Sequence, residues 1–66
     1  MSNISKLATV RKDKGFSQAQ LAQVSGVHRV TIARIETGKI SPNIRTLELL
    51  AEAMGVGVGE LIEKAG

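Results

Sequence analysis

Apolar side chains recur along the chain at helical spacing. Between Ile44 and Met54 they are mostly three or four residues apart, which places them on one face of an α-helix. This stripe consists of Ile44, Leu47, Leu50, Ala51 and Met54. Near the start, Ile4, Leu7 and Ala8 share one helix face with the charged Arg11. Apolar and polar residues never alternate for more than a few positions, so the sequence predicts an all-α fold.

Glycines and residues that favour helix starts divide the chain into five short helices. We expect these at about residues 3–14, 17–25, 29–37, 43–54 and 60–63. Ser2 or Asn3 can cap the first helix, and Ser17 to Gln20 has the pattern of a capping box. Gly26 permits a sharp corner between the second and third helices.

Two of the predicted helices have weak starts. His28 occupies the position before the third helix, where Ser, Asp or Asn would be the favoured cap. Gly57 and Gly59 precede the last helix, which is poorly nucleated and needs tertiary contacts to form.

Length and composition exclude several classes of function. With 66 residues we expect a single domain over 1–66, and the absence of cysteine excludes disulfides and thiolate zinc sites. Because His28 is the only histidine and the carboxylates are scattered, we expect no metal, no cofactor and no enzyme activity. No apolar run approaches the ~18 residues of a membrane span, and none resembles a secretory signal, which predicts a cytoplasmic protein.

The charge of the chain is unevenly distributed. Residues 1–45 carry eight basic and two acidic side chains, whereas residues 46–66 carry one basic and four acidic ones. Such a basic portion favours a polyanionic partner, and nucleic acid before membrane because no basic helix with large apolar anchors is present. The alternative is that solvated surface charges are merely spread unevenly.

The third predicted helix has an exposed face suited to DNA. If Ile32 and Ile35 point inward, the outward residues are Arg29, Val30, Ala33, Arg34 and Thr37. Arginine can donate two hydrogen bonds to guanine, and a small apolar side chain can contact the methyl group of thymine. Taken alone, Val30 would be an ordinary solitary apolar residue on the surface.

Residues 18–36, which read QAQLAQVSGVHRVTIARIE, resemble the helix-turn-helix of the phage repressor and Cro family, also called the Cro/C1 or xenobiotic-response-element type. The likeness extends from Leu7 to Ile62 and includes Ala22, Gly26 and the apolar positions Leu21, Val27, Ile32 and Ile35. Ser25 departs from the pattern because it is polar at an often apolar position. The resemblance implies a compact five-helix, lambda-repressor-like domain in which the second and third helices form the helix-turn-helix.

The resemblance also implies roles for individual residues. The base-reading positions are His28, Arg29, Val30 and Arg34. The phosphate-contacting positions are Ser17, which can equally be only a cap, Gln18, Thr37, Lys39, Asn43 and Arg45. Arg11 and Glu36 match an ion pair between the first and third helices. Lys6, Lys12 and Lys14 are better interpreted as a solvated face of the first helix.

Two functions remain open at this point. The first is a sequence-specific regulator of transcription that binds double-stranded DNA as a symmetric dimer on a pseudo-palindromic operator. A Cro-like repressor, a restriction-modification controller and an autoregulating antitoxin all fit, and a toxin or polymerase partner stays unknown. We expect the dimer interface at Val56, Val58, Leu61 and Ile62.

The second function is that of a protein-protein interaction module built on a helix-turn-helix scaffold. The apolar and acidic C-terminal end of the chain would then supply the binding surface. Salt distinguishes the two functions, because phosphate contacts make DNA affinity fall steeply with ionic strength and an apolar interface responds weakly.

Overall fold

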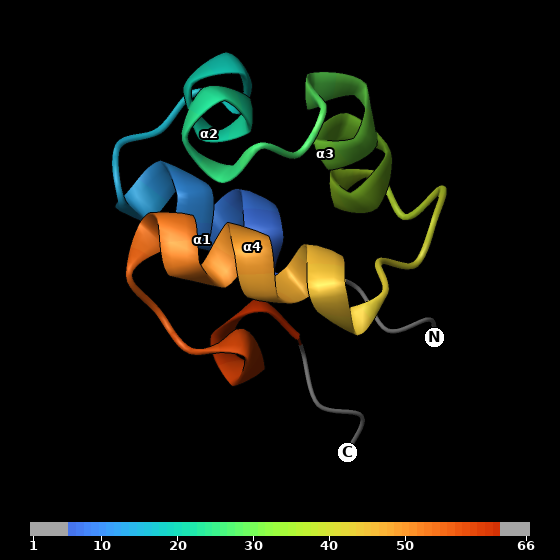
Figure 1. Cartoon of the computed structure of the whole chain (residues 1–66). Coiled ribbons are helices and arrows are strands. Elements are labelled where there is room, and N and C mark those ends of the chain that lie inside the picture. Colours follow the sequence, from blue (N-terminus) through green and yellow to red (C-terminus); the bar gives the residue numbers. More distant parts are fainter. Residues whose placement is uncertain (1–5, 63–66) are drawn as a thin grey trace.

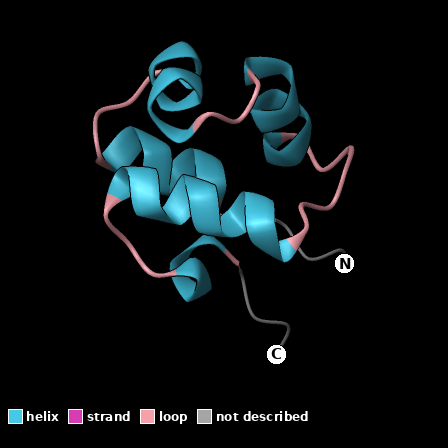
Figure 2. Ribbon diagram, viewed as in Figure 1, coloured by secondary structure: helices cyan, strands magenta, loops and turns pink. Residues whose placement is uncertain are grey.

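The fold is all-α, as expected. The computed structural model describes residues 6–62, which form α1 (Leu7–Asp13), α2 (Gln18–Ser25), α3 (Arg29–Glu36), α4 (Ile44–Met54) and a final 3₁₀ helix, η1 (Val58–Leu61) (Figure 1). Within this range the chain consists of helices and loops without a strand (Figure 2). The expected fifth α-helix is a single 3₁₀ turn that begins earlier, at Val58. The expected caps Ser2 and Asn3 lie outside the described residues.

Local hydrogen bonds explain where the central helices begin. Ser17 Oγ accepts from the Gln20 N–H at 3.0 Å, and Gln20 Oε1 accepts from the Ser17 N–H at 2.8 Å, which confirms the capping box. Asn43 Oδ1 accepts from the Thr46 N–H at 2.8 Å and so caps α4. Gly26 has a φ of +79°, and this left-handed turn joins α2 to α3.

The start of α3 is better capped than the sequence suggested. His28 Nδ1 accepts a hydrogen bond from the Val30 N–H at 3.1 Å. The expectation of a weak cap was wrong because a neutral imidazole nitrogen can replace the usual hydroxyl or carboxylate oxygen as acceptor.

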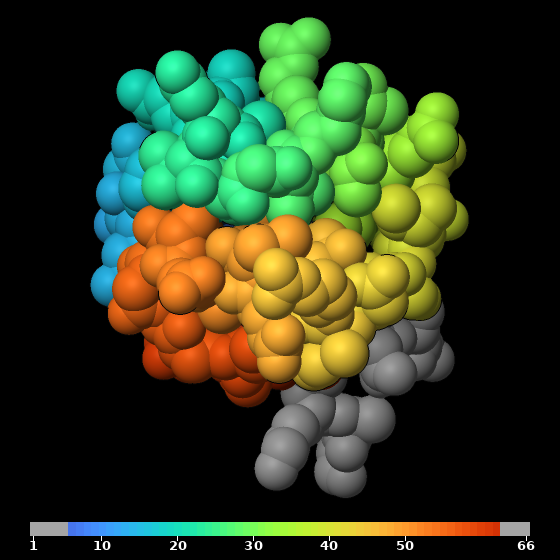
Figure 3. Space-filling model, viewed as in Figure 1, coloured from blue at the N-terminus to red at the C-terminus, as the bar shows by residue number. Residues whose placement is uncertain are grey.

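The core lies between the pair α2 and α3 on one side and α1, α4 and η1 on the other (Figure 1). It consists of Leu7, Leu21, Val27, Ile32, Ile35, Leu47, Leu50, Ala51, Met54 and Leu61. Figure 3, in the same view, shows α4 crossing the molecule directly beneath α2 and α3. The apolar positions that the family resemblance placed in the core are therefore buried.

Ile44 and Ser25 depart from the rule that apolar side chains are buried and polar ones are exposed. Ile44 was expected on the buried stripe of α4 but is 62% exposed, because it is the first residue of the helix and the core begins one turn later, at Leu47. Ser25 is buried although polar, and its hydroxyl oxygen accepts from the Val27 N–H at 3.1 Å. This hydrogen bond satisfies the polar atom at a position that the family pattern usually fills with an apolar side chain.

The C-terminal segment belongs to the core of the monomer more than to its surface. Leu61 is completely buried, and its carbonyl accepts from the Lys6 N–H at 2.9 Å, which joins η1 to the start of α1. Leu61 therefore cannot form the dimer interface expected of it. Val56 and Val58 are half-buried against the core, and only Ile62 is exposed.

Truncation of Leu61 tests this correction. Leu61→Ala should lower the free energy of unfolding by about 2 to 5 kcal/mol, because it removes a fully buried side chain and leaves a cavity. An exposed apolar residue provides the control, since Val24→Ala on α2, where the side chain is 58% exposed, should change stability by less than about 0.5 kcal/mol. Urea denaturation of both variants measures the difference, and equal losses would contradict the buried position of Leu61.

Candidate nucleic-acid interface

A surface hollow of about 570 Å³ lies between the start of α2, the outward face of α3 and the loop that follows it. It is lined by Gln18, Arg29, Val30, Ala33, Arg34, Thr37 and Lys39. All of these except Ala33 were predicted from the sequence as DNA contacts. The remaining predicted contacts, Ser17, His28, Asn43 and Arg45, are exposed but do not line the hollow.

The packing of α3 explains which side chains face outward. Ile32 and Ile35 are buried at 0% and 2% exposure, so the opposite side of the helix faces solvent. Val30 is 45% exposed and Arg34 is exposed, with the small Ala33 between them. The outward face that the helical wheel predicted is therefore free to meet a ligand.

The chemistry of the lining favours an anion. Three cations, Arg29, Arg34 and Lys39, line the hollow, and no carboxylate does. The side chains of Arg29 and Arg34 make no ion pair or hydrogen bond within residues 6–62, so their donors remain available to an external acceptor. A basic concave surface of this kind attracts polyanions such as nucleic acid.

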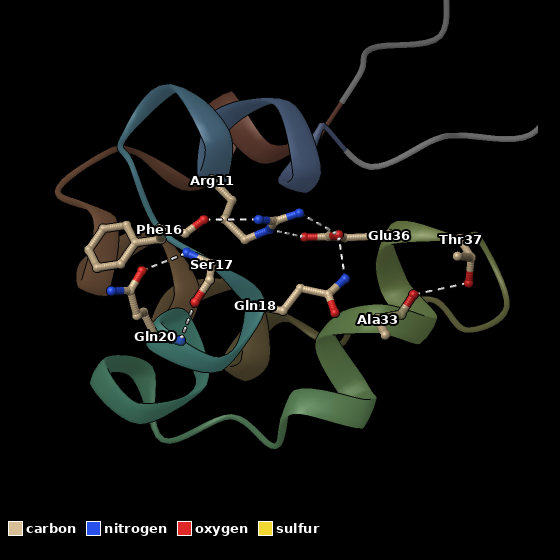
Figure 4. A network of polar contacts seen from close by, with 8 residues as sticks. All are labelled: Arg11, Phe16, Ser17, Gln18, Gln20, Ala33, Glu36 and Thr37. Carbon is tan, nitrogen blue, oxygen red and sulfur yellow. Dashed lines mark hydrogen bonds and ion pairs between the residues drawn. The ribbon is translucent and has the colours of Figure 1, made fainter.

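A buried ion pair supports this surface from beneath. Arg11 Nε donates to Glu36 Oε2 at 2.6 Å, and a second guanidinium nitrogen donates to Oε1 at 3.1 Å. The two side chains are only 10% and 7% exposed, and Arg11 also donates to the Phe16 carbonyl at 2.9 Å. The ion pair implied by the family resemblance is thus present, and it connects α1 to α3 (Figure 4).

Gln18 joins this network from α2. Its Nε2 donates to Glu36 Oε1 at 2.9 Å, and in Figure 4 the three side chains point toward one another from three helices. The sequence did not suggest this bond, because Gln18 and Glu36 are on separate helices and nothing in their spacing pairs them. One amide N–H and the carbonyl oxygen of Gln18 remain for the hollow.

The pKa of Glu36 lies below its ordinary value. Burial alone would raise this pKa, but hydrogen bonds from Arg11 and Gln18, with the charges of Arg11 and Lys12, outweigh burial. The carboxylate is therefore ionised at neutral pH and can only accept hydrogen bonds. This orients the Gln18 amide with its nitrogen toward Glu36.

Local hydrogen bonds also restrict other predicted contacts. Thr37 Oγ1 donates to the Ala33 carbonyl at 3.0 Å, so its proton points into α3, away from an external phosphate. Asn43 and Ser17 each use a side-chain oxygen as a helix cap. These residues have structural tasks in addition to any role at the surface.

Comparison with known proteins identifies relatives across the described chain. The family profile described as helix-turn-helix matches residues 7–61. The chain is 34% identical over 59 residues to the HTH-type transcriptional regulator PuuR of Escherichia coli, covering 89% of this chain and 32% of PuuR. It is 36% identical over 56 residues to the control protein C.SmaI of Serratia marcescens, covering 85% of this chain and 67% of C.SmaI.

A solved structure shares the fold. The crystal structure of the restriction-modification controller protein C.AhdI from Aeromonas hydrophila matches with a TM-score of 0.79 and 31% identity, over 83% of both chains. The present chain spans about a third of the length of PuuR, at 32%.

Across residues 6–62, no helix has the length and apolar character to cross a membrane, and no three potential metal-binding side chains lie close together.

The buried ion pair predicts a large effect on stability. Glu36→Ala should lower the free energy of unfolding by about 3 to 5 kcal/mol, because it leaves the buried guanidinium of Arg11 unpaired. Glu48→Ala, which removes an exposed carboxylate from α4, should change stability by less than about 0.5 kcal/mol. Chemical denaturation at pH 7 compares the two, and a loss below about 1 kcal/mol at Glu36 would make the pair energetically equivalent to an exposed one.

The same carboxylate predicts a pH dependence. Because the folded pKa of Glu36 is lower than its unfolded value of about 4.3, its contribution is complete above that value and is lost as pH falls toward the folded pKa. As the pH is lowered from about 5, the free energy of unfolding should therefore fall more steeply in the wild type than in Glu36→Gln, because only the wild type has this carboxylate to protonate. Parallel pH profiles of the two proteins would argue against a lowered pKa.

Proposed function

The chain belongs to the helix-turn-helix family of Cro/C1 type, and on that basis we propose that it is a sequence-specific, double-stranded-DNA-binding regulator of transcription and not an enzyme. In this proposal α3 enters the major groove, which has the width to admit an α-helix. The observation that carries the proposal is the hollow along α3, with cations and small apolar side chains and no carboxylate in its lining.

Base reading falls to the outward face of α3. Arg34 is exposed on this face and can donate two hydrogen bonds to N7 and O6 of a guanine. Arg29 and Val30, one turn earlier, meet neighbouring base edges, and the exposed His28, which precedes α3, is a further candidate. The small Ala33 lets the helix approach the bases closely.

Contacts to the DNA backbone fall to the ends of the hollow. Lys39 follows the end of α3 and lies where the loop leaves the helix, so its charge is suited to a phosphate. Gln18 begins α2, and its remaining amide N–H is a donor of fixed direction. Ser17, Asn43 and Arg45 are exposed but do not line the hollow, so they are secondary candidates for phosphate contacts. Thr37 must first release its proton from the Ala33 carbonyl.

A symmetric dimer is the second part of the proposal. One domain of this size contacts too few bases for a unique site, and two copies on a pseudo-palindromic operator, one helical turn or ~34 Å apart, double the contacts. Ile62, with the half-buried Val56 and Val58, is the apolar surface left for this purpose, since Leu61 is inside the core. A Cro-like repressor, a controller and an autoregulating antitoxin all remain compatible.

The competing function as a protein-interaction module has less support than DNA binding. That function requires an exposed apolar surface at the C-terminal end of the chain. Leu61, one of the two largest apolar side chains there, is buried in the core. The basic hollow would also have no task in such a module.

Two substitutions distinguish base reading from backbone contact. Arg34→Ala should weaken binding by about 1 to 3 kcal/mol and relax the preference at one base position per half-site. Lys39→Ala should weaken all duplexes alike and reduce the slope of log affinity against log salt by about one unit per lost contact.

The measurement is binding of each variant to a duplex selected from random DNA and to its single-base variants, at several salt concentrations. Lys6→Ala, which removes an exposed lysine outside the hollow, is the control and should change neither quantity. If Arg34→Ala weakened every duplex equally, α3 could not be the base-reading helix.

A further inference from the structure

Val30 is a large apolar side chain in a hollow that three cations also line. It is 45% exposed and lines the hollow with Ala33, between Arg29 and Arg34. Val30, Ala33 and Arg34 are neighbours on one face of α3, because residues three and four apart on a helix lie side by side. The hollow thus combines an apolar patch with a guanidinium that is free of partners in the described chain.

The base edges of the major groove offer one apolar group that fits such a patch. This group is the methyl on C5 of thymine, since the other groups on these edges are hydrogen-bond donors or acceptors. A cytosine methylated on C5 carries the same methyl at the same ring position. Methylated and unmethylated cytosine present the same N4 amino donor in the groove, so the methyl group is the difference that an apolar patch can recognise.

We propose that the patch formed by Val30 and Ala33 binds the 5-methyl group of a pyrimidine beside the guanine read by Arg34, so that affinity for DNA increases with cytosine methylation at that position. This inference rests on the proposed function and adds a ligand chemistry to it. The methylated pyrimidine and the guanine lie close together, because Val30 and Arg34 are about one helical turn apart, or ~5 to 6 Å between Cβ atoms. Base pairs stack ~3.4 Å apart, so the two bases are within about two steps of each other.

The expected effect follows from the burial of one methyl group. Removing a contact of this size weakens binding about three- to fivefold. The test begins with a duplex selected from random DNA, in which each thymine is replaced in turn by uracil, which lacks only the methyl. At the same position, a C·G pair is then compared with a 5-methylcytosine·G pair.

The expected result is a single position per half-site at which uracil weakens binding about three- to fivefold and 5-methylcytosine binds better than cytosine by a similar factor. Val30→Ala should reduce both ratios to less than about twofold, since it removes most of the apolar contact. Val24→Ala is the matched control, because Val24 is an exposed valine on α2 outside the hollow and should leave both ratios unchanged.

Two outcomes would overturn the inference while DNA binding itself stands. One is that uracil has no effect at any position, and the other is that Val30→Ala retains the full effect of the methyl group. Failure of the protein to select or bind any duplex would instead overturn the proposed function. Far-UV circular dichroism of both valine variants confirms that the comparison is made between folded proteins.

Discussion

The arrangement of the first three helices depends on the hydrogen bonds that the buried carboxylate of Glu36 accepts. Glu36 accepts hydrogen bonds from Arg11 on α1 and from Gln18 on α2, while its own backbone ends α3. A charge removed from water is tolerated only when its hydrogen bonds are complete, and here donors on two helices complete them. The angle between α2 and α3 is thereby tied to a polar contact as well as to the apolar core.

This contact also separates two kinds of charge near the candidate interface. Glu36 is the carboxylate nearest in sequence to the basic surface, but its charge is neutralised by Arg11 on the inner side of α3. The outer side keeps Arg29, Arg34 and Lys39 without a competing anion in the hollow. The ion pair therefore stabilises the fold without weakening the positive potential that an approaching polyanion meets.

The sequence predicts much of this structure where a single local rule decides the outcome. Ser17 with Gln20, Gly26 and Asn43 mark helix ends through bonds to nearby backbone, and Ile32 with Ile35 defines the outward face of α3. The position of Leu61 could not be predicted, because a short apolar turn can face its own core or a partner equally well. The bond between Gln18 and Glu36 depends on how two helices meet, which no periodicity encodes.

The outward face of α3 has a consequence for how such a protein can change. Arg29, Val30, Ala33 and Arg34 make no side-chain hydrogen bond or ion pair within the described chain, and none is fully buried. These four positions can therefore be exchanged at little cost to folding. Stability would fall, in contrast, if His28 were replaced by a residue that cannot cap α3, or Gln18 by one that cannot donate to Glu36. Divergence of binding preference among copies of such a gene would accordingly concentrate at these four codons, and libraries that randomise only these would keep most members folded.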